Sequence, residues 1–238
     1  MRLCLLIASL MFATSSMGSD KLPWKVSQMG IGINTGISHL NTQAFNLYTP
    51  ANVRNFKKDQ FLFGAEGFAR FDKCMIGLGA GIAKGDKIKN DTFDYTLSGG
   101  TITFNWAYQL SSKKQWLCFP MASAGFSAYG IGIDQKIQAY QSEMVSNSRR
   151  SLHISNAGVV TDLSMNIYRL LNYSATEGVI KKQSFSQAIG LKIGYMYGFK
   201  NSSWTYTGGS VTEGPKFGMR MVYLKICIGS ISHSAIKQ

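Results

Sequence analysis

The feature that most constrains this chain is a period of two in its apolar residues. Between residues 74 and 83, one face carries Ile76, Leu78 and Ile82, and the other carries mainly glycine. The same alternation recurs in residues 101–108 and 189–195. Successive side chains of a β-strand point to opposite faces, so the pattern predicts strands with one apolar face. No window has the apolar spacing of a helix.

Extended to the whole chain, this pattern predicts eight strands. Their expected bounds are 25–38, 60–72, 74–84, 95–110, 115–129, 151–168, 184–198 and 215–229. Long connections (39–59, 85–94, 130–150, 199–214) alternate with shorter ones (72–73, 111–114, 169–183). Bacterial outer-membrane barrels have an even number of strands, with short turns at one end and longer loops at the other. We therefore expect an all-β fold, an eight-stranded antiparallel up-and-down transmembrane β-barrel.

The N-terminus predicts export. Residues 1–2 are followed by an apolar run that ends at Ala13 and then by small and polar residues, which is the pattern of a secretory signal peptide. Cleavage after Ser15 or after Gly18 fits the preference for small residues. We expect a signal peptide at residues 1–18 and one barrel domain at 19–238, in the bacterial cell outer membrane.

Polar residues on the predicted strands mark the lumen. A soluble barrel buries apolar side chains inside, and a membrane barrel reverses this arrangement. Eight strands leave room for side chains but hardly for a channel. Charges enclosed there must be paired. We expect a polar network in the lumen, formed by Glu66, Arg70, Asn105, Asp162 and Lys192.

Aromatic residues recur near the ends of the predicted strands, as in the interfacial girdles of membrane barrels. The expected girdle residues are Trp24, Trp106, Tyr108, Trp116, Tyr129, Tyr195 and Tyr197. The last strand leaves its orientation open. Its even-numbered apolar residues would place Arg220 outward, whereas Met219 and Met221 argue for the other face. A β-bulge near Arg220 would reconcile the two.

The C-terminal third resembles the outer membrane β-barrel proteins of the Bacteroidetes type. The resemblance rests on the run GLKIGYMYGF at 190–199, on Trp204, and on GPKFGMRMVYLKICIG at 214–229. The segment DLSMNIYRLL at 162–171 is similar as well. The tail after residue 229 departs from many such barrels, because it lacks a terminal aromatic residue. The family is defined by its fold, so the resemblance implies a location and no reaction.

A second resemblance concerns residues 153–156, which read His-Ile-Ser-Asn. This segment resembles the His-x-Ser-Asn motif of outer-membrane lipid A deacylases, which implies His153 as base and Ser155 as nucleophile. Such catalysis also needs a carboxylate to orient the base. The family places it about a dozen residues after the serine, where this chain has Ile167; the nearest later acids are Glu177 and Glu213.

Net charge and the positions of the cysteines and histidines narrow the partners and cofactors to be expected. The formal charge is +13, but the basic residues lie in short clusters at predicted loops, so lipid or surface glycan is a better partner than nucleic acid. Cys74, Cys118 and Cys227 lie in apolar alternating segments and do not suggest a disulfide framework. His39, His153 and His233 are too dispersed for a metal site, and no cofactor is expected.

The sequence favours a membrane barrel without intrinsic catalysis, acting structurally or through its outer loops, in contact with outer-membrane lipid and with lipopolysaccharide as a candidate ligand. Two alternatives remain. A lipid A deacylase-like hydrolase requires outward His153 and Ser155 near a carboxylate. A secreted soluble barrel that binds a small apolar ligand requires the Ile, Leu and Phe faces to point inward around a cavity.

Overall fold

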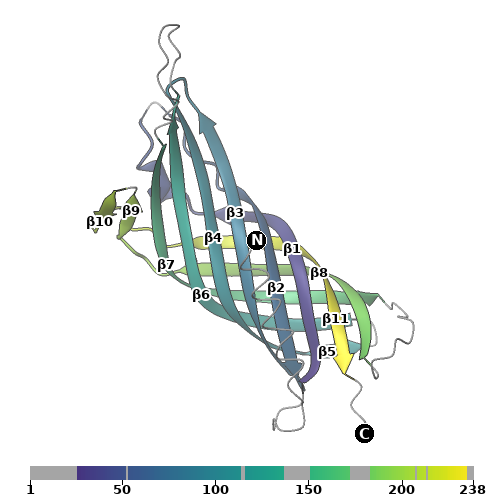
Figure 1. Ribbon diagram of the computed structural model, residues 1–238. Helices are drawn as coiled ribbons and strands as arrows, with labels where there is room; N and C mark the ends of the chain where they lie inside the picture. Colours follow the sequence, from purple (N-terminus) through teal and green to yellow (C-terminus); the bar gives the residue numbers. More distant parts are fainter. Residues whose placement is uncertain are drawn as a thin grey trace.

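Eight long strands form a closed antiparallel barrel in the computed structural model, which describes residues 26–51, 53–113, 116–136, 151–171, 183–206, 208–212 and 214–234 (Figure 1). The strands are β1 Val26–Leu40, β2 Asp59–Phe71, β3 Cys74–Lys89, β4 Phe93–Tyr108, β6 Trp116–Gln135, β7 Ser151–Leu171, β8 Gln183–Gly198 and β11 Arg220–Ser234. Each pairs with its neighbour in the chain, and β1 pairs with β11 to close the ring. The predicted eight-stranded all-β fold is confirmed.

Short elements occupy the connections. They are the helix α2 Gln43–Asn46 and the strands β5 Ser111–Lys113, β9 Trp204–Tyr206 and β10 Gly209–Val211. Strand β9 pairs with β7, beside the outer part of that strand. Among the residues that the structure describes, no helix is long and apolar enough to span a membrane.

The two ends of the barrel differ. At one end, β2 and β3 are joined by the predicted turn at residues 72–73, where Asp72 has a φ of +56°, a conformation that two-residue hairpin turns require. The long connections 41–58 and 199–219 lie at the other end. Short turns face the periplasm in bacterial barrels, so we call the end with Asp72 the inner end and the opposite one the outer end. The predicted signal peptide at 1–18 and most of the 130–150 loop lie outside the described residues.

The strands of the outer hairpins extend farther than the alternation predicted. Strand β3 continues to Lys89, β4 begins at Phe93, and β6 continues to Gln135. Their pairing persists to Lys89↔Asp94 and Phe93↔Gln135, so the loop predicted at 85–94 is largely sheet, and the first residues of the loop predicted at 130–150, up to Gln135, are strand as well. Polar side chains end the apolar alternation there, but the backbone ladder continues.

The last strand is displaced from its predicted bounds. It runs over Arg220–Ser234 rather than 215–229. Its register with β8 and β1 is uninterrupted, so no bulge lies at Arg220. Arg220 and the even-numbered apolar residues face outward together, and Met219 and Met221 face the lumen. One regular strand therefore accounts for both orientations without a bulge.

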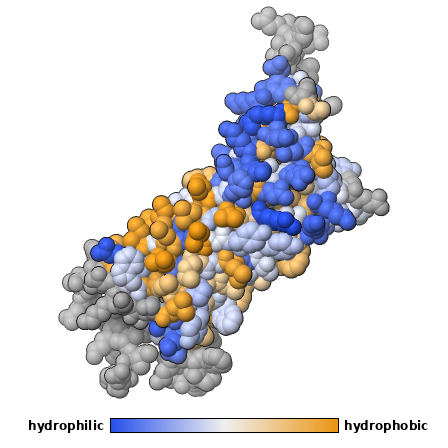
Figure 2. All heavy atoms as spheres, turned by 180° about the vertical axis from the view of Figure 1, so that it is seen from behind, coloured by the Kyte–Doolittle hydropathy of each residue, from blue (hydrophilic) through white to orange (hydrophobic). Residues whose placement is uncertain are grey.

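The outward face of the barrel is apolar. Side chains that are more than half exposed include Ile31, Ile37, Phe61, Ile82, Ile102, Phe104, Phe126, Leu163, Leu191 and Val222. Figure 2 shows hydrophobic residues gathered over one part of the face in view, beyond which a hydrophilic part of the molecule projects. Only a lipid environment removes such a band from water, so the chain is a transmembrane β-barrel of the bacterial outer membrane. A soluble ligand-binding barrel would require the Ile, Leu and Phe faces of the alternating segments to point inward, whereas in the described strands these faces point outward.

A charge in the middle of this band should destabilise the protein in lipid. Leu163 is 67% exposed on β7. We expect Leu163→Arg to lower the free energy of unfolding by about 2–4 kcal/mol in lipid vesicles, measured by urea titration with the heat-dependent shift of the folded barrel on a gel. The control, His153→Arg, lies ten positions farther out on the same face and should cost less than about 1 kcal/mol. Equal costs for the two variants would contradict a lipid-facing Leu163.

Candidate functional site

The middle of the lumen contains a buried ion pair. Lys192 Nζ on β8 lies 2.9 Å from Glu66 Oε2 on β2, across the barrel. The hydroxyl of Tyr168 on β7 donates to the other carboxylate oxygen, Oε1, at 2.8 Å. Lys192 is 5% exposed, so both charges are largely removed from water. Such a pair is tolerated only where hydrogen bonds satisfy its remaining polar atoms, and Tyr168 supplies one of them.

A second carboxylate lies next to this pair. Asp162 on β7 accepts a hydrogen bond from the hydroxyl of Tyr223 on β11, which lies 2.8 and 2.9 Å from its two oxygens. The Tyr223 ring fits against Gly194, where any added Cβ would come within 2.4 Å of the tyrosine oxygen. The Lys225 ammonium lies 4.8 Å from the centre of the same ring. Two carboxylates and two ammonium groups therefore share the lumen.

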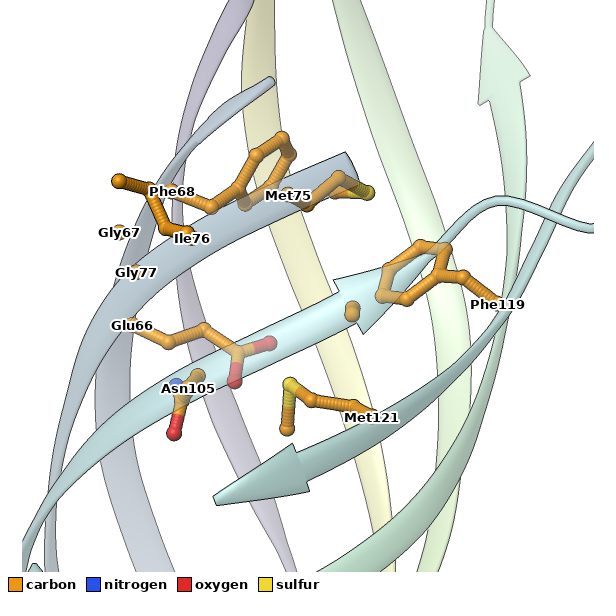
Figure 3. Close-up of a pocket in the computed structure, with 10 residues that line it drawn as sticks. Glu66, Gly67, Phe68, Met75, Ile76, Gly77, Asn105, Phe119 and Met121 are labelled. Carbon is orange, nitrogen blue, oxygen red and sulfur yellow. The ribbon is translucent and has the colours of Figure 1, made fainter. Parts of the chain in front are cut away.

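The other two predicted lumen residues, Asn105 and Arg70, lie at different levels of the barrel. Asn105 is 6% exposed and lies beside Glu66, on the wall of a small cavity that also contacts Phe119 and Met121 (Figure 3). The cavity has a volume of about 20 Å³, enough for about one water molecule. Arg70 lies near the inner end, where it donates to Gln28 Oε1 at 3.0 Å and to the carbonyl of Asp72, apart from the central ion pair.

Apolar clusters close the lumen on both sides of this polar layer. The inner cluster is built around Met75, Leu117, Phe119, Met121 and Tyr168. Phe119 and Tyr168 stack with their ring centres 5.7 Å apart. The outer cluster includes Leu97, Tyr129 and Ile131, which are at most 1% exposed. The side chains of the polar layer and of the two clusters together fill the lumen along its length.

Aromatic residues from the outer loops cover the outer cluster. Phe45 of α2 lies 4.6 Å from Phe217 and 5.7 Å from Trp204, between ring centres. The indole nitrogen of Trp204 donates to the carbonyl of Pro215 at 2.8 Å, which fixes the ring of this 1% exposed residue. We call Phe45, Tyr48, Trp204 and Phe217 the aromatic cap. The cap joins loops that are far apart in the sequence and seals the outer end.

The expected girdle aromatics divide into four groups. Trp106, Tyr108 and Trp116 are exposed near the inner end, and Tyr195 is exposed near the outer end, where Tyr197 is partly buried. Trp24 lies outside the described residues. Tyr129 was expected in the girdle, but it is 1% exposed and points into the lumen against Gly99. Tyr129 shares its parity on β6 with the lumen residues Ser123 and Ser127, and proximity to a strand end did not reveal this.

His153 and Ser155 face outward on the part of β7 that projects beyond the apolar band. The Ser155 hydroxyl lies 2.8 Å from the hydroxyl of Thr205 on β9. Within the described part of the chain, no hydrogen bond joins Ser155 to His153, and no carboxylate pairs with His153. Glu177 and Glu213 lie outside the described residues.

Ion pairs brace the projecting part of the sheet. Arg54 forms a two-pronged pair with Asp86, which also accepts a hydrogen bond from the backbone of Lys57 at 3.0 Å. The Arg54 hydrogen bond lowers the pKa of Asp86 below its usual value of 3.8. Lys136 and Lys87 lie 3.1 and 3.2 Å from the two oxygens of Asp94, and the pKa of Asp94 is also lowered, chiefly by the Lys136 hydrogen bond.

Three residues of the lumen network were missed at the level of sequence: Tyr168, Tyr223 and Lys225. Tyr168 shares strand parity with the predicted lumen residue Asp162, six positions earlier on β7. The unresolved orientation of the last strand concealed Tyr223 and Lys225. The three thiols Cys74, Cys118 and Cys227 lie on three different strands and are free. No cluster of metal-binding side chains occurs among the described residues.

Among the comparisons with known proteins, only the one with solved structures finds proteins that this chain resembles. No family model matches the chain, and no curated protein matches it. The attachment invasion locus protein Ail of Yersinia pestis has a TM-score of 0.44 at 7% identity, over 87% of this chain and 99% of that one. Neisserial surface protein A has a TM-score of 0.39 at 11% identity, over 87% and 96%. A major outer membrane protein of Thermus thermophilus has a TM-score of 0.42 at 11% identity, over 85% and 98%.

The central ion pair gives a stability prediction. We expect Lys192→Met to lower the free energy of unfolding by about 3–5 kcal/mol, because it leaves the Glu66 charge buried without its partner. The double variant Glu66→Gln/Lys192→Met should recover most of this loss, since neither charge remains. Urea unfolding in vesicles measures both. If the double variant were as unstable as the single one, packing rather than charge pairing would explain the loss.

The Asp86 pair gives a pH prediction. A carboxyl whose pKa is lowered on folding stabilises the fold above its unfolded pKa, and this contribution is lost as the pH falls through the folded pKa. Below about pH 3.8, hydrogen exchange at residues 53–57 should therefore rise more than in the membrane-spanning strands. Asp86→Asn should show raised exchange there already at pH 7. If exchange at residues 53–57 responded neither to the lower pH nor to Asp86→Asn, this segment would not depend on the Arg54–Asp86 ion pair.

Proposed function

We propose that this protein is a closed outer-membrane barrel that anchors a rigid binding surface outside the cell, without intrinsic catalysis. The observation that carries the proposal is the projection of the outer hairpins, as paired sheet, beyond the apolar band (Figure 1, Figure 2). A membrane-spanning strand needs about 9–11 residues. Strand β6 has 20 residues and β7 has 21, so about half of each lies outside the membrane.

The filled lumen supports a binding role over transport. The polar layer, the two apolar clusters and the aromatic cap leave cavities of about 20 and 10 Å³ among the residues around them. A solute path would need these packed side chains to move together, including the Glu66–Lys192 pair. The rigid part of the chain that is available to other molecules is the outer surface.

The charge of that surface favours anionic partners. The described residues at the outer end contain ten basic side chains: Arg54, Lys57, Lys58, Lys84, Lys87, Lys89, Lys136, Lys200, Lys216 and Arg220. They contain five acidic ones: Asp59, Asp86, Asp91, Asp94 and Asp134. A surplus of exposed cations raises the local concentration of anionic ligands. Surface glycans and lipopolysaccharide are therefore the partner classes that we propose.

Two further inferences accompany this role. The residues at 190–199 and 214–229 support membership among the Bacteroidetes-type outer membrane β-barrel proteins. The pattern of the first 18 residues supports their removal as a signal peptide during export. A catalytic role for His153 and Ser155 has less support, because the Ser155 hydroxyl is engaged by Thr205.

The proposal is tested with the purified barrel in lipid. Planar bilayers should show no steady conductance steps, and immobilised heparin, as a probe for polyanionic glycans, should retain the protein in a salt-dependent way. Lys87→Gln/Lys89→Gln on the projecting part of β3 should elute at lower salt than wild type. Lys73→Gln/Arg169→Gln, which removes the same charge at the inner end, should elute with wild type.

Three outcomes would contradict the proposal. Discrete conductance steps would replace the closed barrel with a channel. Equal elution shifts for the two charge variants would remove the outer surface as the binding site. Release of acyl chains from lipid A by wild type but not by Ser155→Ala would make the protein a hydrolase.

A further inference from the structure

Four adjacent strands change from apolar to charged at one boundary on the outward face. They are β11, β1, β2 and β3, which are neighbours in the sheet. On each strand a side chain that is more than half exposed marks the last apolar position: Val222, Ile37, Phe61 and Ile82. Two positions farther out on the same strands stand Arg220, His39, Asp59 and Lys84. We call these four residues the charged rim.

The distance between the two rows places the rim at the headgroups of the outer leaflet. Two residues along a strand correspond to roughly 6.7 Å. The apolar side chains of the band therefore lie against acyl chains, while the rim lies immediately outside the hydrocarbon. Adjacent strands are about 4.8 Å apart, so Arg220 and Lys84, three strand intervals apart, are separated by roughly 14 Å or more along the rim.

The opposite side of the barrel lacks such charges. The sheet ladder continues from Lys84 to Ser98 on β4, then to Gly130 on β6 and Ser155 on β7. These outward positions are uncharged, and so are Gly100, Ala128 and Ala157, the next outward positions toward the membrane on the same three strands. At the level of the rim, β4, β6 and β7 therefore carry no cation, in contrast to β11 and β3. Loop solvation alone would not require this asymmetry.

The charges within the rim are unequally paired. His39 Nδ1 lies 3.0 Å from Asp59 Oδ1, so the single acid of the rim is engaged by its neighbour. Arg220 and Lys84 form no ion pair with any described residue, and both are exposed. Lys58 is a further exposed cation near the rim. Its backbone carbonyl accepts a hydrogen bond from the N–H of Leu40, the last residue of β1. The rim thus presents two cations without ion-pair partners among the described residues, one on either side of the hydrogen-bonded His39–Asp59 pair.

We propose that Arg220 and Lys84 bind phosphate groups of lipopolysaccharide, whose acyl chains lie on Val222, Ile37, Phe61 and Ile82. Guanidinium and ammonium groups form charge-assisted hydrogen bonds with phosphate oxygens. The site joins these donors to an apolar surface directly beneath them, which a phosphorylated lipid matches and a free anion does not. The inference rests on the proposed location of the outer end in the lipopolysaccharide leaflet, but it concerns the lipid-facing rim rather than the projecting binding surface.

The test measures binding of lipid A by native mass spectrometry of the full mature chain in detergent micelles. Wild type should bind bis-phosphorylated lipid A and should bind dephosphorylated lipid A at least tenfold more weakly. Each cation near a charged lipid surface contributes roughly a fivefold gain in affinity, so Arg220→Gln/Lys84→Gln should bind the phosphorylated form roughly 30-fold more weakly. Inorganic phosphate at the same concentration should not compete, because it lacks acyl chains.

Lys87→Gln/Lys89→Gln is the matched control, with the same charge change on the projecting sheet, and it should bind lipid A as wild type does. Both variants must show the heat-dependent gel shift of the folded barrel. Equal binding of the phosphorylated and dephosphorylated lipids, equal losses in the two variants, or competition by inorganic phosphate would each overturn the rim site. The shift in heparin elution caused by Lys87→Gln/Lys89→Gln reports on the projecting surface, and the loss of lipid A binding caused by Arg220→Gln/Lys84→Gln reports on the rim. The rim site can therefore fail while the proposed function stands, and the proposed function can fail while the rim site stands.

Discussion

Backbone hydrogen bonding is the constraint on which the rest of this structure depends. The hydrocarbon of a membrane offers no partner for peptide groups, so a spanning sheet has to satisfy all of them within itself. The antiparallel ladder between β1 and β11 does this by joining the first and last strands of the ring. Once the ring is closed, each strand has one face toward lipid and one toward a narrow lumen, and the sequence of every strand follows from that division.

Closure with eight strands also determines what fills the interior. So small a ring has space for side chains and little else. The chain fills it with two apolar clusters and a central layer in which Glu66, Asp162, Lys192 and Lys225 balance in charge. Glycines such as Gly194 and Gly99 create the space for Tyr223 and Tyr129. The barrel is therefore a solid anchor, and its chemistry toward other molecules lies on its outer surface.

Sequence patterns anticipated the ring and most strand bounds, because the alternation reports directly on lipid and lumen faces. They failed where that alternation ended before the strand did: Lys89 and Gln135 end strands that continue as polar sheet above the membrane. They also failed for Tyr129, whose position near a strand end suggested a girdle although its parity places it inside. The Glu66–Lys192 contact joins strands far apart in the chain, and the aromatic cap joins separate loops, so local periodicity carries no signal for either.

The most direct test of a lipid-facing band around a filled interior is fluorescence quenching of single-tryptophan variants by brominated lipids. Trp106 is 57% exposed on the outward face, whereas Trp204 is 1% exposed within the aromatic cap. In vesicles, a variant that retains only Trp106 should be strongly quenched by bromine on the acyl chains, and one that retains only Trp204 should not. Strong quenching of Trp204 together with an unquenched Trp106 would contradict the membrane-spanning barrel described above.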